Sequence, residues 1–135
     1  MYLLDTNILS ELTKKRPNHH LIKRLGQVPG RHLFTSVICV MELRYGSSLR
    51  KDFEVFWQMI VSEIISRVQI VRVGYEEAVL AGDILGELKT GGNVIGIEDV
   101  LIGATALSHD FAVVTANVRH FKRIQRLQIE NWLVP

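Results

Sequence analysis

The sequence predicts an α/β fold, a three-layer α/β/α sandwich built around a short parallel sheet. Three observations predict it. Short apolar runs alternate along the chain with segments of helical periodicity. The runs are apolar enough for strands that are buried on both faces, as in parallel sheets. No repeat, low-complexity tract or Gly/Ser linker divides the chain, so we expect residues 1–135 to form a single domain.

The first thirty residues predict one strand and two helices. Met1–Leu4 has the pattern of a short buried strand. A helix is expected over Asn7–Lys15, because Pro17 cannot continue it. A second helix is expected over residues 19–27, and the Pro29–Gly30 turn follows it.

The middle of the chain repeats this alternation. His32–Thr35 is a second short strand, and Ser36 is placed to cap the helix that we expect to run to about Leu49. Another helix is expected over about 52–66. Arg67–Val73 alternates and is rich in β-formers, so it predicts a third strand.

The last third adds two helices and two strands. Residues 75–90 predict a helix that buries one stripe, and Gly91–Asn93 ends it. Asp99–His109 is apolar nearly all round, which is typical of a central, buried helix. Ala112–Thr115 is a fourth strand and Ile129–Asn131 a fifth. The stripe expected on the first of these helices comprises Ala78, Gly82, Leu85 and Leu88.

Polar residues stand where a parallel sheet binds ligands, just beyond the carboxyl ends of its strands. Asp5 follows the first strand, and Thr115 and Asn117 follow the fourth. Glu42 lies on the helix after the second strand. Asp99 opens the helix before the fourth. This topology can bring all five to one edge of the sheet.

Each acid alone also has an ordinary explanation. Asp5 and Asp99 both stand at predicted helix starts, where a carboxylate caps the backbone. Glu42 shares a predicted helix face with Tyr45 and Leu49, and a glutamate in an apolar stripe is costly unless it reaches water or an arginine.

Taken together, the three acids predict a metal site. Carboxylates that converge with no cysteine or histidine expected beside them suit Mg²⁺ or Mn²⁺. They would otherwise repel one another. A cation so held activates water and neutralises phosphate charge, which indicates metal-dependent phosphodiester cleavage.

The charge distribution is compatible with a nucleic-acid substrate. The formal net charge is only +2, but basic residues cluster at Lys14–Arg16 and again over Arg119–Arg126, around His120. Such clusters contact phosphates or form ordinary solvated surface, and both interpretations stay open. We expect His120 itself to lie at the surface.

Several other classes find no support. No apolar stretch is long enough for a membrane span, no secretory signal is visible, and the single Cys39 allows no internal disulfide. We therefore expect a cytoplasmic protein with no membrane association. Nucleotide-binding glycine motifs and a GxSxG setting are missing. Asp5-Thr6-Asn7 is similar to the DxD motif of phosphoaspartyl phosphatases, but Asn7 stands where that motif has its second acid, so the usual acid/base is missing.

Three sequence blocks resemble the PIN-domain family, and more narrowly the VapC-type toxins of bacterial toxin–antitoxin pairs. They are LLDTNILSEL, SVICVMELRYGS and GGNVIGIEDVLIGATALSHDFAVVTANVRHFKRIQRLQIENWL. The resemblance implies a PIN-like fold and a ribonuclease that depends on Mg²⁺ (or Mn²⁺). It also implies a homodimer and a small VapB-like antitoxin that occupies and inhibits the active site.

The resemblance also implies roles for the candidate residues. By position, Asp5, Glu42 and Asp99 match three family acids, and Thr115 matches the polar residue after the fourth strand. Asp5 and Asp99 would bind the metal directly, and Glu42 would bind it through water or position the attacking water. Many PIN domains carry a fourth acid where this chain has Asn117, a weaker cation ligand, so the number of metals stays open.

Two alternatives remain at this point. One is a non-catalytic RNA-binding PIN module, favoured by the acid that is missing at position 117. The other is a metal-dependent DNA nuclease or phosphatase that uses the same acids. The intact set of three acids favours the ribonuclease.

Overall fold

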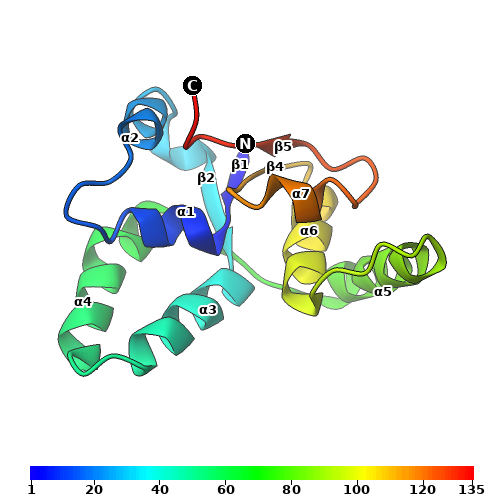
Figure 1. The fold of residues 1–135 in the computed structure, drawn as a ribbon, viewed down its shortest axis with the longest axis horizontal. Helices are drawn as coiled ribbons and strands as arrows, with labels where there is room; N and C mark the ends of the chain where they lie inside the picture. Colours follow the sequence, from blue (N-terminus) through cyan, green and yellow to red (C-terminus); the bar gives the residue numbers. More distant parts are fainter.

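Five parallel strands form the centre of the computed structural model, which describes residues 1–135 (Figure 1). The strand order is β3-β2-β1-β4-β5, so the first strand lies in the middle. In register, Leu3 pairs with Phe34 on one side and Val113 on the other. The strands are β1 (Tyr2–Leu4), β2 (Leu33–Ser36), β3 (Gln69–Val71), β4 (Ala112–Val114) and β5 (Ile129–Glu130).

Helices cover this sheet and connect its strands. They are α1 (Thr6–Glu11), α2 (His19–Gly26), α3 (Val37–Ser48), α4 (Phe53–Glu63), α5 (Tyr75–Thr90), α6 (Ile97–His109) and α7 (Val118–Phe121), with short 3₁₀ turns at Gly30–His32 and Ile65–Arg67. In Figure 1, α4 lies to the left of the central strands, and α5 and α6 lie to the right. Right-handed crossovers that run in opposite directions along the sheet place helices on opposite faces. The predicted α/β/α architecture is confirmed. No helix combines the length and the apolarity that crossing a bilayer requires.

The core is formed by the central strands together with α6 and with buried residues of α1, α2 and α4. Leu3 of β1 and Val113 of β4 are fully buried, as expected for strands covered on both faces. On α6 nearly every residue from Val100 to Ala106 is buried, which confirms the predicted central helix. A Cβ on Gly103 would lie 2.5 Å from the Ile124 Cδ1, so any larger residue at this position would require the Ile124 side chain to move.

Four predicted elements have different bounds in the structure. Helix α1 ends at Glu11, not Lys15, because the Glu11 carboxylate pairs with Lys14 and accepts from the Asn18 backbone N–H at 3.1 Å, which folds the chain into turns. Helix α4 and strand β3 are each shorter than predicted. Helix α6 begins at Ile97, after the extended Gly96, rather than at Asp99. Asp99 therefore lies in its first turn, which is one of the two positions, N-cap or first turn, expected for it.

The stripe predicted for α5 was right at Leu88, which is buried, and wrong at its two small residues, while Leu85 is half-buried. The buried residues are Ala81, Ile84 and Leu88, and Ala78 and Gly82 are exposed. Small residues recur on both sides of this helix. Packing against α6 therefore selects the face that carries the larger Ile84 side chain, because it buries more apolar area.

Candidate active site

The candidate site is a cleft at the carboxyl ends of β1 and β4, where the strand order reverses direction. Its volume is about 570 Å³. Four of the five predicted residues line it, namely Asp5, Glu42, Asp99 and Asn117. The fifth, Thr115, is fully buried behind Asp5. The other lining residues are Thr6, Asn7, Ser10, Glu11, Lys14, Ala116 and Leu133.

Asp5 is held by hydrogen bonds from three neighbours. Its Oδ1 accepts from the Thr6 backbone N–H at 2.8 Å, so it is indeed the N-cap of α1. Its Oδ2 accepts from the Thr115 hydroxyl at 2.7 Å and from the Asn7 amide at 3.1 Å. The Asn7 Oδ1 also accepts from the Ala116 backbone N–H, which joins α1 to the end of β4. Capping and a place in the cleft are therefore compatible roles for Asp5.

Burial raises the pKa of the Asp5 carboxyl to about 6, and the charges of Asp99 and Glu42 act in the same direction. The hydrogen bonds from Thr115 and Thr6 act against this rise. No basic side chain is among the groups that lower this pKa. The negative charge gathered here is thus uncompensated, which is the condition that a divalent cation relieves.

Glu42 lines the cleft beside Thr6, and the Thr6 hydroxyl donates a hydrogen bond to the Glu42 Oε1 at 2.6 Å. The expected apolar stripe around it was wrong, because Tyr45 and Leu49 are 66% and 71% exposed. The buried stripe of α3 runs one position further along, through Leu43. Glu42 therefore stands at the edge of the buried face and avoids the desolvation that a central position would impose.

Asp99 and Asn117 meet on the other side of the cleft, together with His120. The Asn117 Nδ2 lies 3.5 Å from the Asp99 Oδ2 and 2.8 Å from the His120 Nδ1. The His120 Nδ1 lies 3.3 Å from the same Asp99 oxygen. His120 was expected at the surface, and its side chain is 45% exposed while its Nδ1 faces Asp99. Its position one turn after Asn117 does not by itself predict that approach, because Asp99 lies on a different helix.

Cys39 is a second unexpected neighbour, one turn before Glu42 on α3. Its Sγ and carboxylate oxygens of Asp5 and Glu42 all lie within 4.8 Å of one another. Burial, followed by the charge of Asp5, raises the pKa of the Cys39 thiol to about 11, so at neutral pH it is protonated. The ionised donors that remain are oxygens, and this donor set fits Mg²⁺ or Mn²⁺.

Some basic residues of the two clusters make defined contacts, and others are exposed. Lys14 lines the cleft, where it is paired with Glu11 at 2.8 Å. Arg123 donates to the Val94 carbonyl at 3.0 Å, while Arg119 and Lys122 are exposed near the Asn117 end of the site. Positive side chains therefore flank the acids without neutralising Asp5, an arrangement suited to a phosphate chain that approaches a cation.

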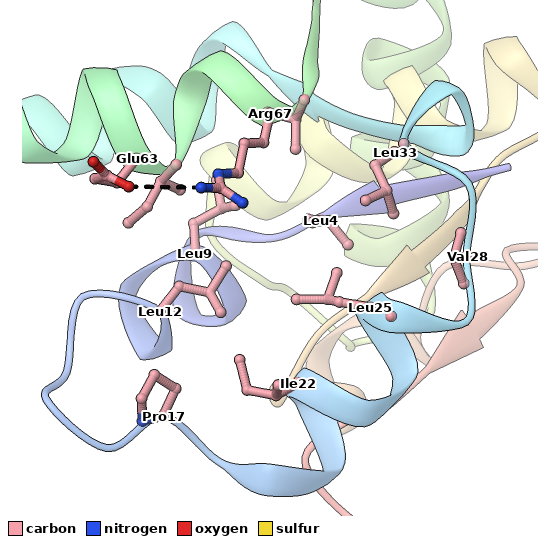
Figure 2. Close-up of a pocket in the computed structure, with 14 residues that line it drawn as sticks. Leu4, Leu9, Leu12, Pro17, Ile22, Leu25, Val28, Leu33, Glu63 and Arg67 are labelled. Carbon is pink, nitrogen blue, oxygen red and sulfur yellow. Dashed lines mark ion pairs between the residues drawn. The ribbon is translucent and has the colours of Figure 1, made fainter.

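A separate cleft of about 600 Å³ lies between α1, α2 and the segment that follows α4 (Figure 2). Its walls are mostly apolar, and Leu9, Ile22 and Leu25 are among the side chains that line it. The Glu63–Arg67 ion pair, at 3.6 Å, is its only charged feature. This cleft has no convergent set of polar groups for catalysis, so the acidic cleft is the candidate active site.

Known proteins resemble this chain over nearly its whole length. The family model described as "PIN domain" matches residues 2–127. "Ribonuclease VapC2" from Haemophilus influenzae is 33% identical over 132 residues, 98% of each chain. "tRNA(fMet)-specific endonuclease VapC" from Salmonella typhimurium is 32% identical and covers 97% of each chain. A crystal structure of VapBC2 from Rickettsia felis bound to a promoter DNA fragment aligns with a TM-score of 0.87 and 31% identity, over 97% of this chain and 98% of that one.

Proposed function

This chain belongs to the PIN-domain family, and on that premise we propose that it is a metal-dependent endoribonuclease, the toxin of a VapBC-type pair. The observation that carries the proposal is the meeting of three acids from separate segments in one cleft. Asp5 comes from the end of β1, Glu42 from α3 and Asp99 from α6. Burying a carboxylate among other acids lowers the stability of a protein. Such an arrangement is therefore typical of a binding or catalytic site.

Asp5 and Asp99 would hold a Mg²⁺ or Mn²⁺ ion directly. Glu42 would hold it through water or position the attacking water. The cation supplies activation of water and neutralisation of charge on the phosphate. Water adds to phosphorus and the bond to the 3′ oxygen breaks, which leaves 5′-phosphate and 3′-hydroxyl ends. Asn7 and Thr115 fix the orientation of Asp5, and Asn117 completes the pocket beside Asp99.

RNA is the proposed substrate, because the relatives at 32% and 33% identity carry ribonuclease names over nearly the whole length of this chain. One of them is named as specific for tRNA(fMet), so transfer RNA is the first substrate to test. The solved Rickettsia felis complex supports a VapB-like antitoxin as partner. A homodimer is also part of the proposal. The choice of RNA and of the antitoxin rests on the names of similar proteins, and the three acids are residues of this chain.

A side-by-side incubation tests the proposal. Transfer RNA, total RNA, duplex DNA and a small phosphoester are each incubated with the protein, once in Mg²⁺ and once in EDTA. Cleavage of RNA alone, in Mg²⁺ alone, is the expected result. RNA that is bound but not cleaved would favour the non-catalytic binding module. Turnover of DNA or of the small phosphoester would favour the other hydrolase.

A further inference from the structure

We propose that His120 acts with Asp99 and Asn117 as a ligand set for a divalent cation, and that the imidazole makes this side of the cleft prefer Mn²⁺ to Mg²⁺. The inference rests on the proposed function and names a donor and a metal preference within the same site. The sequence does not predict this donor, because no pattern in it places a histidine beside the three acids.

The three side chains form a triangle with the spacing of metal ligands. Its edges are 2.8 Å from Asn117 to His120, 3.3 Å from His120 to Asp99, and 3.5 Å from Asn117 to Asp99. An octahedral ion with bonds of about 2.1 Å keeps adjacent ligand atoms about 3 Å apart. One cation can therefore reach all three groups while water fills its other positions.

Asp99 and His120 can each offer a lone pair as they stand, and Asn117 can do so once its amide has turned. The Asp99 Oδ2 is a carboxylate oxygen. The His120 Nδ1 lies within hydrogen-bond distance of the Asn117 amide N–H, so in the tautomer that carries its proton on Nε2 it is an acceptor, and its lone pair is free for a cation when the amide turns away. A half-turn of the Asn117 amide exchanges its Nδ2 for Oδ1 and supplies the third donor.

The triangle is held in place by the surrounding structure. Phe121, next to His120 on α7, is fully buried and fixes that short helix against the core. The Asn117 backbone N–H donates to the Thr115 hydroxyl at 2.8 Å, which is itself bonded to Asp5. The His120 side chain is still 45% exposed, so a cation and water can reach it.

The donor chemistry determines which cation is preferred. Mg²⁺ takes oxygen ligands and retains much of its water, whereas first-row transition ions also accept imidazole nitrogen. A set of two oxygens and one nitrogen therefore favours Mn²⁺ over Mg²⁺. The His120 nitrogen supplies a ligand where the fourth acid of many other PIN domains is missing.

Spectroscopy of the full chain loaded with one equivalent of Mn²⁺ tests the proposal without any reaction. Electron spin-echo modulation detects a nitrogen bound directly to Mn²⁺. We expect nitrogen coupling in the wild-type protein and none in His120→Ala. The matched control is His19→Ala, because His19 is an exposed histidine on α2, and it should keep the signal.

Calorimetric titrations with each metal give the second readout. Mn²⁺ should bind wild-type protein at least about tenfold more tightly than Mg²⁺, and His120→Ala should lose most of that preference with little change in Mg²⁺ affinity. Nitrogen coupling that survives in His120→Ala, or equal affinities in the wild type, would overturn the proposal. If RNA cleavage in Mg²⁺ persists in that case, the proposed function stands. If no metal binds and cleavage is also absent, both fail.

Discussion

Asp5 combines two roles at the scale of one residue. It caps α1 through one carboxylate oxygen and presents the other to a cleft that contains two further acids. The cap alone would be satisfied at the surface, where a carboxylate ionises freely. Burial and like charges instead raise its pKa to about 6. The sequence identified the residue but not this cost, because burial depends on Thr115 and α3, which are distant in the chain.

Removing one hydroxyl tests the support of Asp5. The Thr115 hydroxyl donates to Asp5 and accepts from the Asn117 backbone, so Thr115→Val leaves both groups short of a partner. We expect a loss of about 1–3 kcal/mol in the free energy of unfolding, measured by urea titration in EDTA. Thr115→Ser keeps the hydroxyl and should retain most of the stability. Equal stabilities of the two variants would show that this hydrogen bond contributes little.

The pKa of Asp5 predicts how stability changes with pH in the metal-free protein. Folding raises this pKa to about 6 from an ordinary value of 3.8. Between those values the folded chain holds a proton that the unfolded chain releases. The contribution of Asp5 is therefore fully present below about pH 4 and is lost as pH rises through about 6, at most about 3 kcal/mol.

Thermal unfolding of wild-type protein and of Asp5→Asn, at pH 4 to 8 in EDTA, measures this contribution as the difference between the two curves. Added Mg²⁺ or Mn²⁺ competes with the proton, so its stabilisation of the wild type should grow over the same pH range. A difference that does not change between pH 4 and 7 would contradict the assignment.

At the scale of elements, the number of strands, their positions along the chain and most of the helices could be predicted from the sequence, whereas the order of the strands in the sheet was not predicted. The strands were visible because β1 and β4 are buried on both faces and form apolar runs. The bounds of α5 were predicted closely, since Gly74 and Gly91 flank it. The buried face of α3 was predicted wrongly and that of α5 only in part, because apolar side chains also occupy the exposed faces of both helices.

Helix α7 shows a second limit of prediction. Four residues do not form a helix by propensity alone, and this one is held by burial of Phe121. The position of His120 next to Asp99 depends on that burial, so it could not be predicted from the local sequence.

The close approach of α6 to the chain after α7 gives a prediction at this scale. Gly103→Val would place its side chain against Ile124, so we expect a loss of about 1–3 kcal/mol in the free energy of unfolding, measured with urea. Gly46, within α3, has nothing within 4 Å of an added Cβ, so Gly46→Ala should be neutral or stabilising. Equal effects at both positions would argue against this packing.

At the scale of the whole molecule, the fold places the acids at the point where the strand order reverses, and Lys14 is the one basic side chain that lines their cleft. This placement followed from the parallel topology and was predictable. The shape of the cleft was not, because it depends on loops such as the one that brings Leu133 to its edge. Substrate binding outside the cleft therefore needs its own test.

We expect Arg119 and Lys122 to bind RNA phosphates. Replacing both by Gln should weaken RNA binding and lower the slope of log affinity against log salt by about 0.7 for each phosphate that is no longer neutralised. Fluorescence anisotropy on an Asp5→Asn background measures binding without cleavage. Lys51→Gln with Arg72→Gln removes the same charge from other exposed positions and is the matched control. Identical slopes for the two pairs would remove Arg119 and Lys122 from the interface.

The central claim is that Asp5, Glu42 and Asp99 hold a cation, and that the protein needs this cation to hydrolyse RNA with water. The measurement that tests it most directly is the rate of RNA cleavage by wild-type protein and by Asp5→Asn, in Mn²⁺, in Mg²⁺ and in EDTA, with circular dichroism to confirm that both proteins are folded. We predict that cleavage leaves 5′-phosphate ends, stops in EDTA, and falls at least about 100-fold in Asp5→Asn. Full activity in EDTA, or an equal rate in the folded variant, would contradict the claim.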